Sequence, residues 1–288
     1  MFKNLSAGAI GVGGSTLELA ALAKTAGFGG MDLNAGEAAT LLELGELDVL
    51  KALYDRCGLR PGGFGLPVDF RRDEETSAKG LAALPRLARA AAAMGCRRCP
   101  TWVLPFSNEL PFAENFETHR RRLRACAEVL APHGIWLGLE FVGPKTMRVG
   151  KAHEFIWNMA GMLELCDAIG TGNVGLLLDC WHWYTSGGTV ADILALRPEQ
   201  VVYVHVNDAP AGVPVDEQVD NVRRMPGETG VIDIAGFLTA LARIGYDGPV
   251  TAEPFVPSLK ELPALEACRR TSAALGKILA QAGLAEAR

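Results

Sequence analysis

The stretch Gly175–Gly188 reads GLLLDCWHWYTSGG, and it joins an apolar run to polar residues that a buried strand does not ordinarily carry. The apolar start is typical of a strand that is covered on both faces. The run ends in Asp179, and His182 follows three positions later among aromatic residues, before the chain breaks at Ser-Gly-Gly. We therefore predict a strand over residues 173–181 whose end delivers polar side chains to a cavity.

Strand-like and helix-like segments alternate along the whole chain. The strands are expected at residues 5–12, 29–34, 59–67, 96–105, 135–143, 173–181, 201–208 and 248–255. The helices are expected at residues 15–28, 37–57, 74–95, 113–133, 152–169, 189–196, 233–245 and 259–282. Ser15 and Glu18 have the spacing of a capping box at the start of the first helix. Pro85 marks a kink or a break in the third helix.

This alternation predicts an α/β protein with a parallel sheet. Eight strand–helix units in 288 residues fit a closed (β/α)8 TIM barrel, and we expect residues 1–288 to form a single domain. An open doubly wound sheet is the alternative. The glycine-rich turn GVGGST, after the first strand, lacks the third glycine of the dinucleotide-binding fingerprint, so a dinucleotide site there has weak support.

The composition limits the kind of protein. The formal net charge is −5, which argues against nucleic acid as a partner because phosphate binding favours a basic face. No apolar run reaches the roughly 18 residues of a membrane span, and the start of the chain lacks a clear signal peptide, so we expect a cytoplasmic protein. The seven cysteines include one CxxC pair, Cys96 and Cys99, for which packing is favoured over zinc or redox chemistry.

Four consecutive strands are expected to end in residue types that bind metals. In a TIM barrel the active site lies at the carboxyl ends of the strands. At their carboxyl ends, the last four expected strands carry Glu140, Asp179, His205 (with Asp208 beyond it) and Glu253. Taken singly, each carboxylate is more often a solvated or ion-paired group at the rim, and His205 is more often a hydrogen-bonded core residue.

Together these side chains predict a site for one divalent cation. Carboxylates that converge in one cavity raise one another's pKa, and a cation removes that cost. Three carboxylates and one imidazole suit Mn²⁺, Mg²⁺, Co²⁺ or Zn²⁺, and carboxylate-rich sites favour the harder ions. His182 lies one short turn beyond Asp179 and is expected in the same mouth. It is interpreted as a substrate-binding or proton-donating imidazole, with a cap of the following turn as the alternative.

A resemblance to a known family is carried by the segments GLEF, GLLLDCWHWY, YVHVND, MPGETGVID and GPVTAEPF, between about residues 137 and 255. The chain resembles the xylose isomerase-like barrel superfamily of sugar and sugar-phosphate isomerases and epimerases, inosose isomerases and dehydratases, ketose 3-epimerases and endonuclease IV. The resemblance implies that Glu140, Asp179, His205 and Glu253 bind one divalent ion, with Mn²⁺ favoured. It also implies that His182 binds a substrate oxygen.

The same resemblance places a substrate-binding arginine before the Pro-Gly-Glu turn, where this chain has Arg223 and Arg224 in NVRRMPGE. We favour Arg224 and leave Arg223 open. Glu228 in that turn is expected to orient the loop. The 3-epimerases carry a further glutamate where this chain has Thr146, so the exact substrate geometry of those enzymes is in doubt here.

Two cations and one tryptophan are expected to contact substrate near the fourth and fifth strands. Lys145 and Arg148 flank Thr146 in GPKTMRVG, and they suggest a different substrate head, such as a carboxylate, a phosphate or an extra hydroxyl. A solvated loop is the alternative for these two residues. Trp102 in the fourth strand is the third expected contact.

These residues predict a metal-dependent isomerase or epimerase of a sugar, a sugar phosphate or an inosose. The substrate ketone would bind the ion, and proton abstraction next to it would give a metal-stabilised enediolate. Glu140 and Glu253 are the expected catalytic pair, because their strands can place them on opposite faces of the substrate. A dehydratase of the inosose or dehydroshikimate type is the alternative on the same site. An endonuclease IV-like phosphodiesterase, which needs more histidines, and a non-catalytic binding barrel are less favoured, and assembly into a homo-oligomer stays open.

Overall fold

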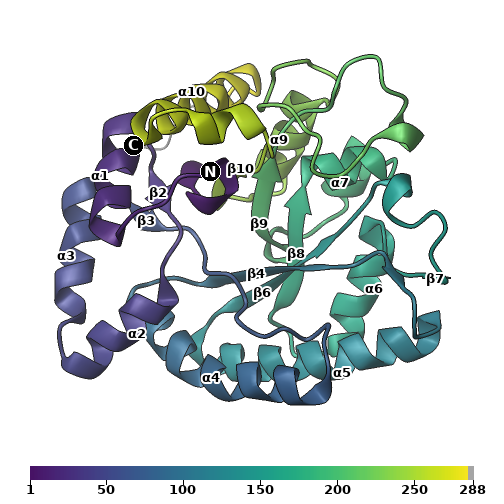
Figure 1. Cartoon of the computed structure of the whole chain (residues 1–288), viewed down its shortest axis with the longest axis horizontal. Helices are drawn as coiled ribbons and strands as arrows, with labels where there is room; N and C mark the ends of the chain where they lie inside the picture. Colours follow the sequence, from purple (N-terminus) through teal and green to yellow (C-terminus); the bar gives the residue numbers. More distant parts are fainter. Residues whose placement is uncertain (285–288) are drawn as a thin grey trace.

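Eight parallel strands form the centre of the computed structural model, which describes residues 1–284 (Figure 1). Their order in the sheet is β3-β2-β1-β10-β9-β8-β6-β4, and every pair of neighbours is parallel. Their bounds are β1 Phe2–Leu5, β2 Gly30–Met31, β3 Arg60–Pro61, β4 Arg98–Val103, β6 Trp136–Phe141, β8 Val174–Asp179, β9 Val201–Val206 and β10 Pro249–Ala252. This arrangement confirms the predicted (β/α)8 barrel.

The two outermost strands of this order, β3 and β4, are joined by the chain that follows β3. Phe64 donates its backbone N–H to the carbonyl of Arg98 at 3.1 Å, and Leu66 donates to Pro100 at 3.0 Å. These bonds close the sheet on itself, so the open doubly wound alternative is wrong.

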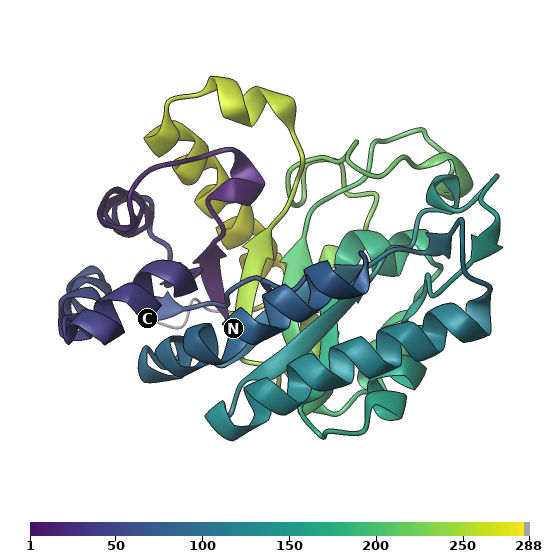
Figure 2. The same ribbon diagram turned by 60° about the horizontal axis from the view of Figure 1, so that its bottom comes forward.

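Helices surround the strands, as the two views show (Figures 1 and 2). The helices are α1 Thr16–Ala26, α2 Ala35–Leu44, α3 Leu47–Cys57, α4 Glu74–Ala93, α5 Phe112–Leu130, α6 Met159–Ile169, α7 Cys180–Thr185, α8 Val190–Leu194, α9 Ile234–Arg243 and α10 Ala264–Gln281. Two short strands, β5 Phe106–Ser107 and β7 His153–Glu154, pair antiparallel outside the barrel. None of the helices within residues 1–284 has the length and apolar character needed to cross a membrane.

Because helices cover the outer face of the barrel, the strand sequences do not alternate between apolar and polar residues. Leu176, Leu177 and Leu178 are consecutive in β8, and none of them is more than 3% exposed. Side chains on both faces of this strand are therefore removed from water, as the apolar run predicts.

The start of the chain differs from the sequence prediction. The first strand lies at Phe2–Leu5 and pairs with Pro249–Thr251 of β10, whereas residues 8–10 form a 3-10 turn. Gly11 has φ +73°, a left-handed conformation that ends this turn. The apolar composition of residues 5–12 therefore reflects packing of a turn and not an extended strand.

Other helix and strand boundaries also differ from the predicted ones. The predicted helix 37–57 is two helices, because Gly45 (φ +75°) ends α2. Helix α4 continues through Pro85. The predicted strand 173–181 ends at Asp179, and the next residue starts α7. The capping box of Ser15 and Glu18 is confirmed.

Gly30 provides a test of the packing between β1, β2 and β3. A Cβ atom there would clash with the ring of Phe2 and lie 2.8 Å from the carbonyl oxygen of Arg60, whereas at Gly29 the nearest atom would be 3.5 Å away. We expect Gly30→Ala to lower the free energy of unfolding by about 1–3 kcal/mol, and Gly29→Ala to change it by less than about 1 kcal/mol. Urea denaturation of both variants measures the difference, and equal effects would contradict this account of the packing.

Candidate metal centre

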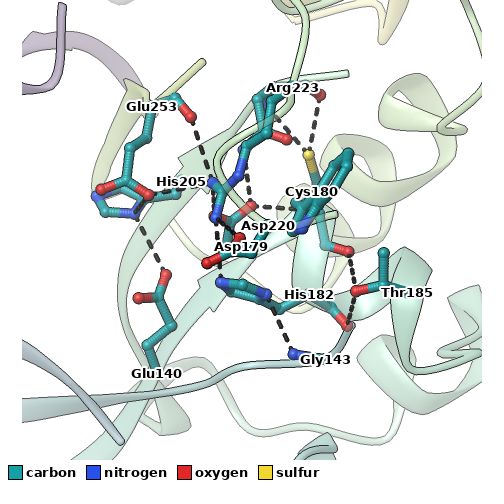
Figure 3. Close-up of polar contacts among 12 residues, drawn as sticks. Glu140, Gly143, Asp179, Cys180, His182, Thr185, His205, Asp220, Arg223 and Glu253 are labelled. Atoms are coloured by element: carbon teal, nitrogen blue, oxygen red, sulfur yellow. Dashed lines mark hydrogen bonds and ion pairs between the residues drawn. The ribbon is translucent and has the colours of Figure 1, made fainter. Parts of the chain in front are cut away.

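Four strand ends bring three carboxylates and one imidazole together at the carboxyl-terminal mouth of the barrel (Figure 3). Glu140 lies near the end of β6, Asp179 ends β8, His205 is in β9, and Glu253 directly follows β10. The parallel register sets Asp179 beside His205. One potential ligand atom from each of the four residues lies within 4.8 Å of the others. The structure thus places together the four residues that were singled out as ligands.

The contacts inside this group fit a bound cation. His205 Nδ1 lies 3.4 Å from Glu140 Oε1 and 3.4 Å from Glu253 Oε2. Within the described part of the chain, Glu140 Oε1 and His205 Nδ1 are buried and have no hydrogen-bond partner. Buried polar atoms are rarely left in this state in proteins. A divalent ion coordinated by both atoms would remove the deficit, and the donor set suits such an ion.

The electrostatics of the ligands depend on what occupies the space between them. Burial raises the pKa of Glu140, and repulsion from Glu253 adds to this. Burial alone would lower the pKa of His205, but the two glutamates outweigh it and raise this pKa well above its ordinary value. Burial alone would raise the pKa of Glu253, but His205 and Arg223 outweigh it and lower this pKa. A metal would compete with the protons of Glu140 and His205, because ligands coordinate in their deprotonated forms.

Asp179 has a structural role as well as a position in the cluster. Its Oδ1 accepts the backbone N–H of Trp181 at 2.8 Å and the side-chain amide of Asn207 at 3.0 Å. The first of these bonds caps the amino end of α7. Asp179 therefore ends the apolar strand and starts the helix that carries His182, and its second oxygen accepts a hydrogen bond from Arg223.

Arg223 is the cation that the structure supplies to this cluster. Its side chain is 1% exposed, and its Nη1 lies 2.8 Å from Asp179 Oδ2 and 3.1 Å from Glu253 Oε2. Its Nη2 donates to Asp220 Oδ1 at 2.9 Å. Burial alone would lower the pKa of Arg223, but the three carboxylates outweigh it, so the pKa is raised and the guanidinium stays charged.

Arg224, the arginine that is favoured from the sequence, lies outside this cluster. Its backbone exchanges two hydrogen bonds with Asp208, at 2.8 and 2.9 Å, and its Nη1 donates to the carbonyl of Arg223. Since neighbouring residues in an extended segment point to opposite sides, this bridge turns Arg223 inward and Arg224 outward. The preference for Arg224 over Arg223 therefore has no support in the geometry.

His182 is a neutral hydrogen-bond donor that faces the cluster. It is 2% exposed, and burial lowers its pKa to about 3. Gly143 donates its backbone N–H to Nδ1 at 3.1 Å, so the ring proton resides on Nε2. Nε2 also lies 3.3 Å from Nη2 of Arg223, which can only donate. A neutral imidazole accepts at one nitrogen, and the shorter bond from Gly143 assigns that role to Nδ1, so the contact between Nε2 and Arg223 brings two donors side by side. A Cβ at Gly143 would clash with the carbonyl oxygen of His182, so this close approach requires glycine.

A pocket of about 300 Å³ opens beside the cluster. Its wall is formed by Trp102, Leu104, Glu140, Val142, Met147, His182, Asp220, Asn221, Arg223, Glu253 and Phe255. Trp102 is 43% exposed and lies where a ligand can reach its ring.

Two other residues singled out as substrate contacts lie elsewhere. Lys145 Nζ pairs with Asp216 at 2.6 Å near the surface. Arg148 is buried, donates to the carbonyl of Gly143 at 2.8 Å and stacks on Trp157 at 3.9 Å. Both side chains therefore hold the loop after β6 in place and are not part of the pocket wall.

No sequence pattern indicated Asp220 or Phe255 as pocket residues. Asp220 lies in the loop after β9, where only its ion pair with Arg223 identifies it. Phe255 has φ +46°, which is rare for a residue with a side chain, and its ring lies 4.6 Å from the Arg223 guanidinium. Backbone strain of this kind is often found at functional sites.

The geometry agrees with the comparisons to known proteins. The family model for xylose isomerase-like TIM barrels matches residues 20–275. The chain belongs to this family. A solved xylose isomerase domain protein from Alicyclobacillus acidocaldarius superimposes with a TM-score of 0.83 at 32% identity, over 95% of this chain and 96% of that chain.

Two curated relatives give the range of activities among similar proteins. An inosose isomerase from Halalkalibacterium halodurans is 31% identical over 150 residues, which cover 51% of this chain and 49% of the relative. A 3-dehydroshikimate dehydratase from Pseudomonas aeruginosa is 30% identical over 142 residues, which cover 49% of this chain and 21% of the relative. This member of the family thus spans half or less of the curated relatives it matches.

The cluster predicts a pH-dependent metal affinity. We expect the protein to bind about one divalent ion per chain, and Asp179→Asn, but not the exposed Asp167→Asn, to abolish binding. Because the pKa values of Glu140 and His205 are raised, protons compete with the ion, and the affinity should fall as pH is lowered from roughly 9 to 6. Titration calorimetry with Mn²⁺ measures both effects. An affinity that is independent of pH, or retained in Asp179→Asn, would contradict the assignment of the ligands.

Variants of the adjacent residues Arg223 and Arg224 form a matched pair that tests the charge balance of the cluster. In metal-free protein, Arg223→Gln leaves Asp179, which is 0% exposed, without its ion pair. Breaking a buried pair in this way costs about 3–5 kcal/mol of folding free energy. Arg224→Gln removes a hydrogen bond to a backbone carbonyl and should cost less than about 1 kcal/mol. Chemical denaturation after chelation measures both, and similar losses would show that the two residues have been distinguished wrongly.

Proposed function

We propose that this chain is a metal-dependent isomerase or epimerase that acts on a ketose or an inosose. The observation that carries the proposal is the position of Glu140 and Glu253 on two sides of His205, each with a carboxylate oxygen 3.4 Å from Nδ1 (Figure 3). Two carboxylates so placed can remove a proton from one face of a bound ketone and return it to the other. The similarity to inosose isomerases supports this class of reaction.

The proposed reaction divides the work between the ion and the side chains. A divalent ion held by the four ligands would supply Lewis acidity toward the ketone oxygen of the substrate. Glu140 would take the proton from the neighbouring carbon, and the electron pair of that C–H bond would move toward the ketone oxygen. Glu253 would deliver a proton from the opposite side, or the roles would reverse. In an isomerase one carboxylate can serve both steps.

His182 and Arg223 are suited to hold the oxygen on which charge develops. The N–H at His182 Nε2 is a donor fixed by the bond from Gly143 to Nδ1. Arg223 adds a permanent positive charge beside it. Donors that are oriented before the reaction stabilise a developing oxyanion without reorganisation, which is a large contribution to catalysis.

The pocket favours a neutral polyhydroxylated substrate over a sugar phosphate. Among the described residues of the pocket wall, Arg223 is the one cation, and three carboxylates already surround it. Lys145 and Arg148 are engaged elsewhere. Trp102 and Phe255 offer apolar faces against which a sugar or cyclitol ring can pack. Mn²⁺ as the resident ion, the cytoplasm as the location and a homo-oligomeric state are parts of the proposal that rest on the sequence.

A dehydratase is the second candidate, and the similarity to 3-dehydroshikimate dehydratase favours it. The first step would be the same, with Glu140 taking the proton next to the ketone. The electron pair would then expel a hydroxyl group from the next carbon, and a protonated group of the site would release it as water.

Proton exchange in D₂O tests the proposal. We expect the Mn²⁺-loaded protein to introduce deuterium at one carbon of a ketohexose or an inosose without loss of water, as followed by NMR. His182→Ala should retain the ion and slow this exchange by roughly 10²-fold or more, because it removes the oxyanion donor and no ligand. Loss of water, with formation of an absorbing enone, would move the assignment to the dehydratase. If neither exchange nor loss of water occurs with ketohexoses, their phosphates or inososes, both the isomerase or epimerase and the dehydratase are rejected.

A further inference from the structure

Asn207 places a buried carboxamide directly against one of the candidate metal ligands. It follows the end of β9, two positions after His205, and it is 0% exposed. Its Nδ2 donates a hydrogen bond to Asp179 Oδ1 at 3.0 Å. The opposite orientation of the amide would set two oxygens against each other, so the contact requires this one. The proposed reaction makes no use of Asn207.

The backbone of Asn207 is tied to the residue that follows Asp179. The backbone N–H of Asn207 donates to Cys180 Sγ at 3.3 Å, and the Cys180 thiol donates to the carbonyl of Asn207 at 3.2 Å. Cys180 is 0% exposed as well. Together with the bond from the side chain, these contacts join the end of β9 to the junction between β8 and α7. The amide is therefore held in one place relative to Asp179.

The hydrogen bonds to Asp179 determine which of its oxygens can bind a metal ion. An ionised carboxylate has about four lone-pair positions, two on each oxygen. Oδ1 accepts the backbone N–H of Trp181 at 2.8 Å and the Asn207 amide at 3.0 Å, so both of its positions are used. Among the described residues, Oδ2 accepts one bond, from Arg223 Nη1 at 2.8 Å. Oδ2 thus keeps a lone pair for an ion.

Asn207 differs from the other two donors to Asp179. The N–H of Trp181 belongs to the backbone, so almost any residue at that position can supply it. Arg223 brings a positive charge, which it shares with Asp220 and Glu253. Asn207 is neutral, and within residues 1–284 its Nδ2 donates to Asp179 alone. What Asn207 gives to Asp179 is therefore orientation and not charge.

We propose that Asn207 is a positioning residue of the metal centre, which holds Asp179 so that Oδ2 is the oxygen that binds the ion. Asn207 would act through Asp179 and would not touch the ion itself. Without this donor, Oδ1 would regain a lone pair, and the carboxylate could turn or coordinate through both oxygens. Groups that hydrogen-bond to a metal ligand typically change the metal affinity by about 10- to 100-fold.

Asn173 offers a matched control at the other end of β8. It directly precedes this strand and is 8% exposed, and its Nδ2 donates to the carbonyls of Ala127 and Ile135 at 3.0 Å each. In the described chain, the Oδ1 atoms of Asn173 and Asn207 are both buried without a partner. Leucine has the branching of asparagine, so each Asn→Leu variant removes a buried donor without a large change of shape.

Titration calorimetry with Mn²⁺, at one fixed pH, measures the role of Asn207. We expect Asn207→Leu to weaken Mn²⁺ binding by about 10-fold or more, and Asn173→Leu to change it by less than about two-fold. Urea denaturation after chelation shows whether the two variants are folded. There Asn173→Leu should lose at least as much stability as Asn207→Leu, because it loses two hydrogen bonds and Asn207→Leu loses one.

The visible absorption of bound Co²⁺ provides a readout that a loss of stability alone would not change. If Asp179 coordinates through both oxygens in Asn207→Leu, the coordination number of Co²⁺ rises, and its molar absorption at saturating Co²⁺ should fall. Asn173→Leu should retain the spectrum of the unchanged protein.

Three outcomes would overturn the proposal: an unchanged Mn²⁺ affinity in Asn207→Leu, an equal loss of affinity in both variants, or an unchanged Co²⁺ spectrum. If circular dichroism shows that Asn207→Leu does not fold, Asn207→Ala and Asn173→Ala replace the pair, with the same expectations. Failure of the unchanged protein to bind Mn²⁺ would reject the metal centre and the proposal together. No substrate is used, so the result is independent of the proposed isomerase or epimerase reaction.

Discussion

The burial of three carboxylates within a few ångströms of one another is the constraint on which the rest of this structure depends. At an effective dielectric constant of about 20, two unit charges 4 Å apart repel by roughly 4 kcal/mol. Glu140, Asp179 and Glu253 can all be ionised only if positive charge is close. Arg223 supplies one such charge permanently. A divalent ion would supply two more, so that three positive charges would meet the four negative charges of these carboxylates and of Asp220, which also pairs with Arg223.

The need for a positive charge near these carboxylates explains why the long loop after β9 is held in one conformation. Arg223 can reach the carboxylates only if its loop is fixed, and the loop is fixed by one buried side chain. The carboxylate of Asp208 accepts the backbone N–H groups of Ala209, Thr229, Gly230 and Ile232, at 2.7–3.1 Å. Glu228 accepts the N–H of Met225 at 2.9 Å and shapes the turn, in agreement with the orienting role expected for it. A loop that looks peripheral in sequence is thereby part of the charge balance of the centre.

The carboxyl-terminal face of the barrel is divided by the stack of Arg71 on Trp102. On one side the wall presents a neutral imidazole donor, apolar rings and one fully paired arginine, which suits a neutral polyol. On the other side Arg71, Arg72, Arg121 and Arg122 pair with Asp69 and Glu74, and His119 is a neutral, buried imidazole. His182 and His119 are both uncharged through burial, but opposite tautomers give them opposite hydrogen-bonding roles.

The amino-acid sequence by itself determined the barrel and the positions of the four candidate metal ligands, because both depend on local patterns. Eight apolar runs alternate with helical segments, and Asp179 interrupts one such run where a strand must end. Parallel strands of a barrel present their carboxyl ends at one rim, so the meeting of the four candidate ligands follows from the fold class. The capping box of Ser15 and Glu18 was likewise a matter of local spacing.

Only the tertiary structure decided which of the remaining residues surround the candidate metal centre and which are buried elsewhere. Arg223 and Arg224 are chemically identical neighbours, and the bridge of Arg224 to Asp208, distant from it in the chain, turns one inward. Phe255 reaches the pocket through a positive φ that no sequence pattern indicates. His119 has the sequence context of an ordinary helix residue, and it is buried because Phe70 and Phe155, distant in the chain, pack against its ring. In each case the direction of a side chain depends on contacts between residues far apart in sequence, and local patterns carry no information about such contacts.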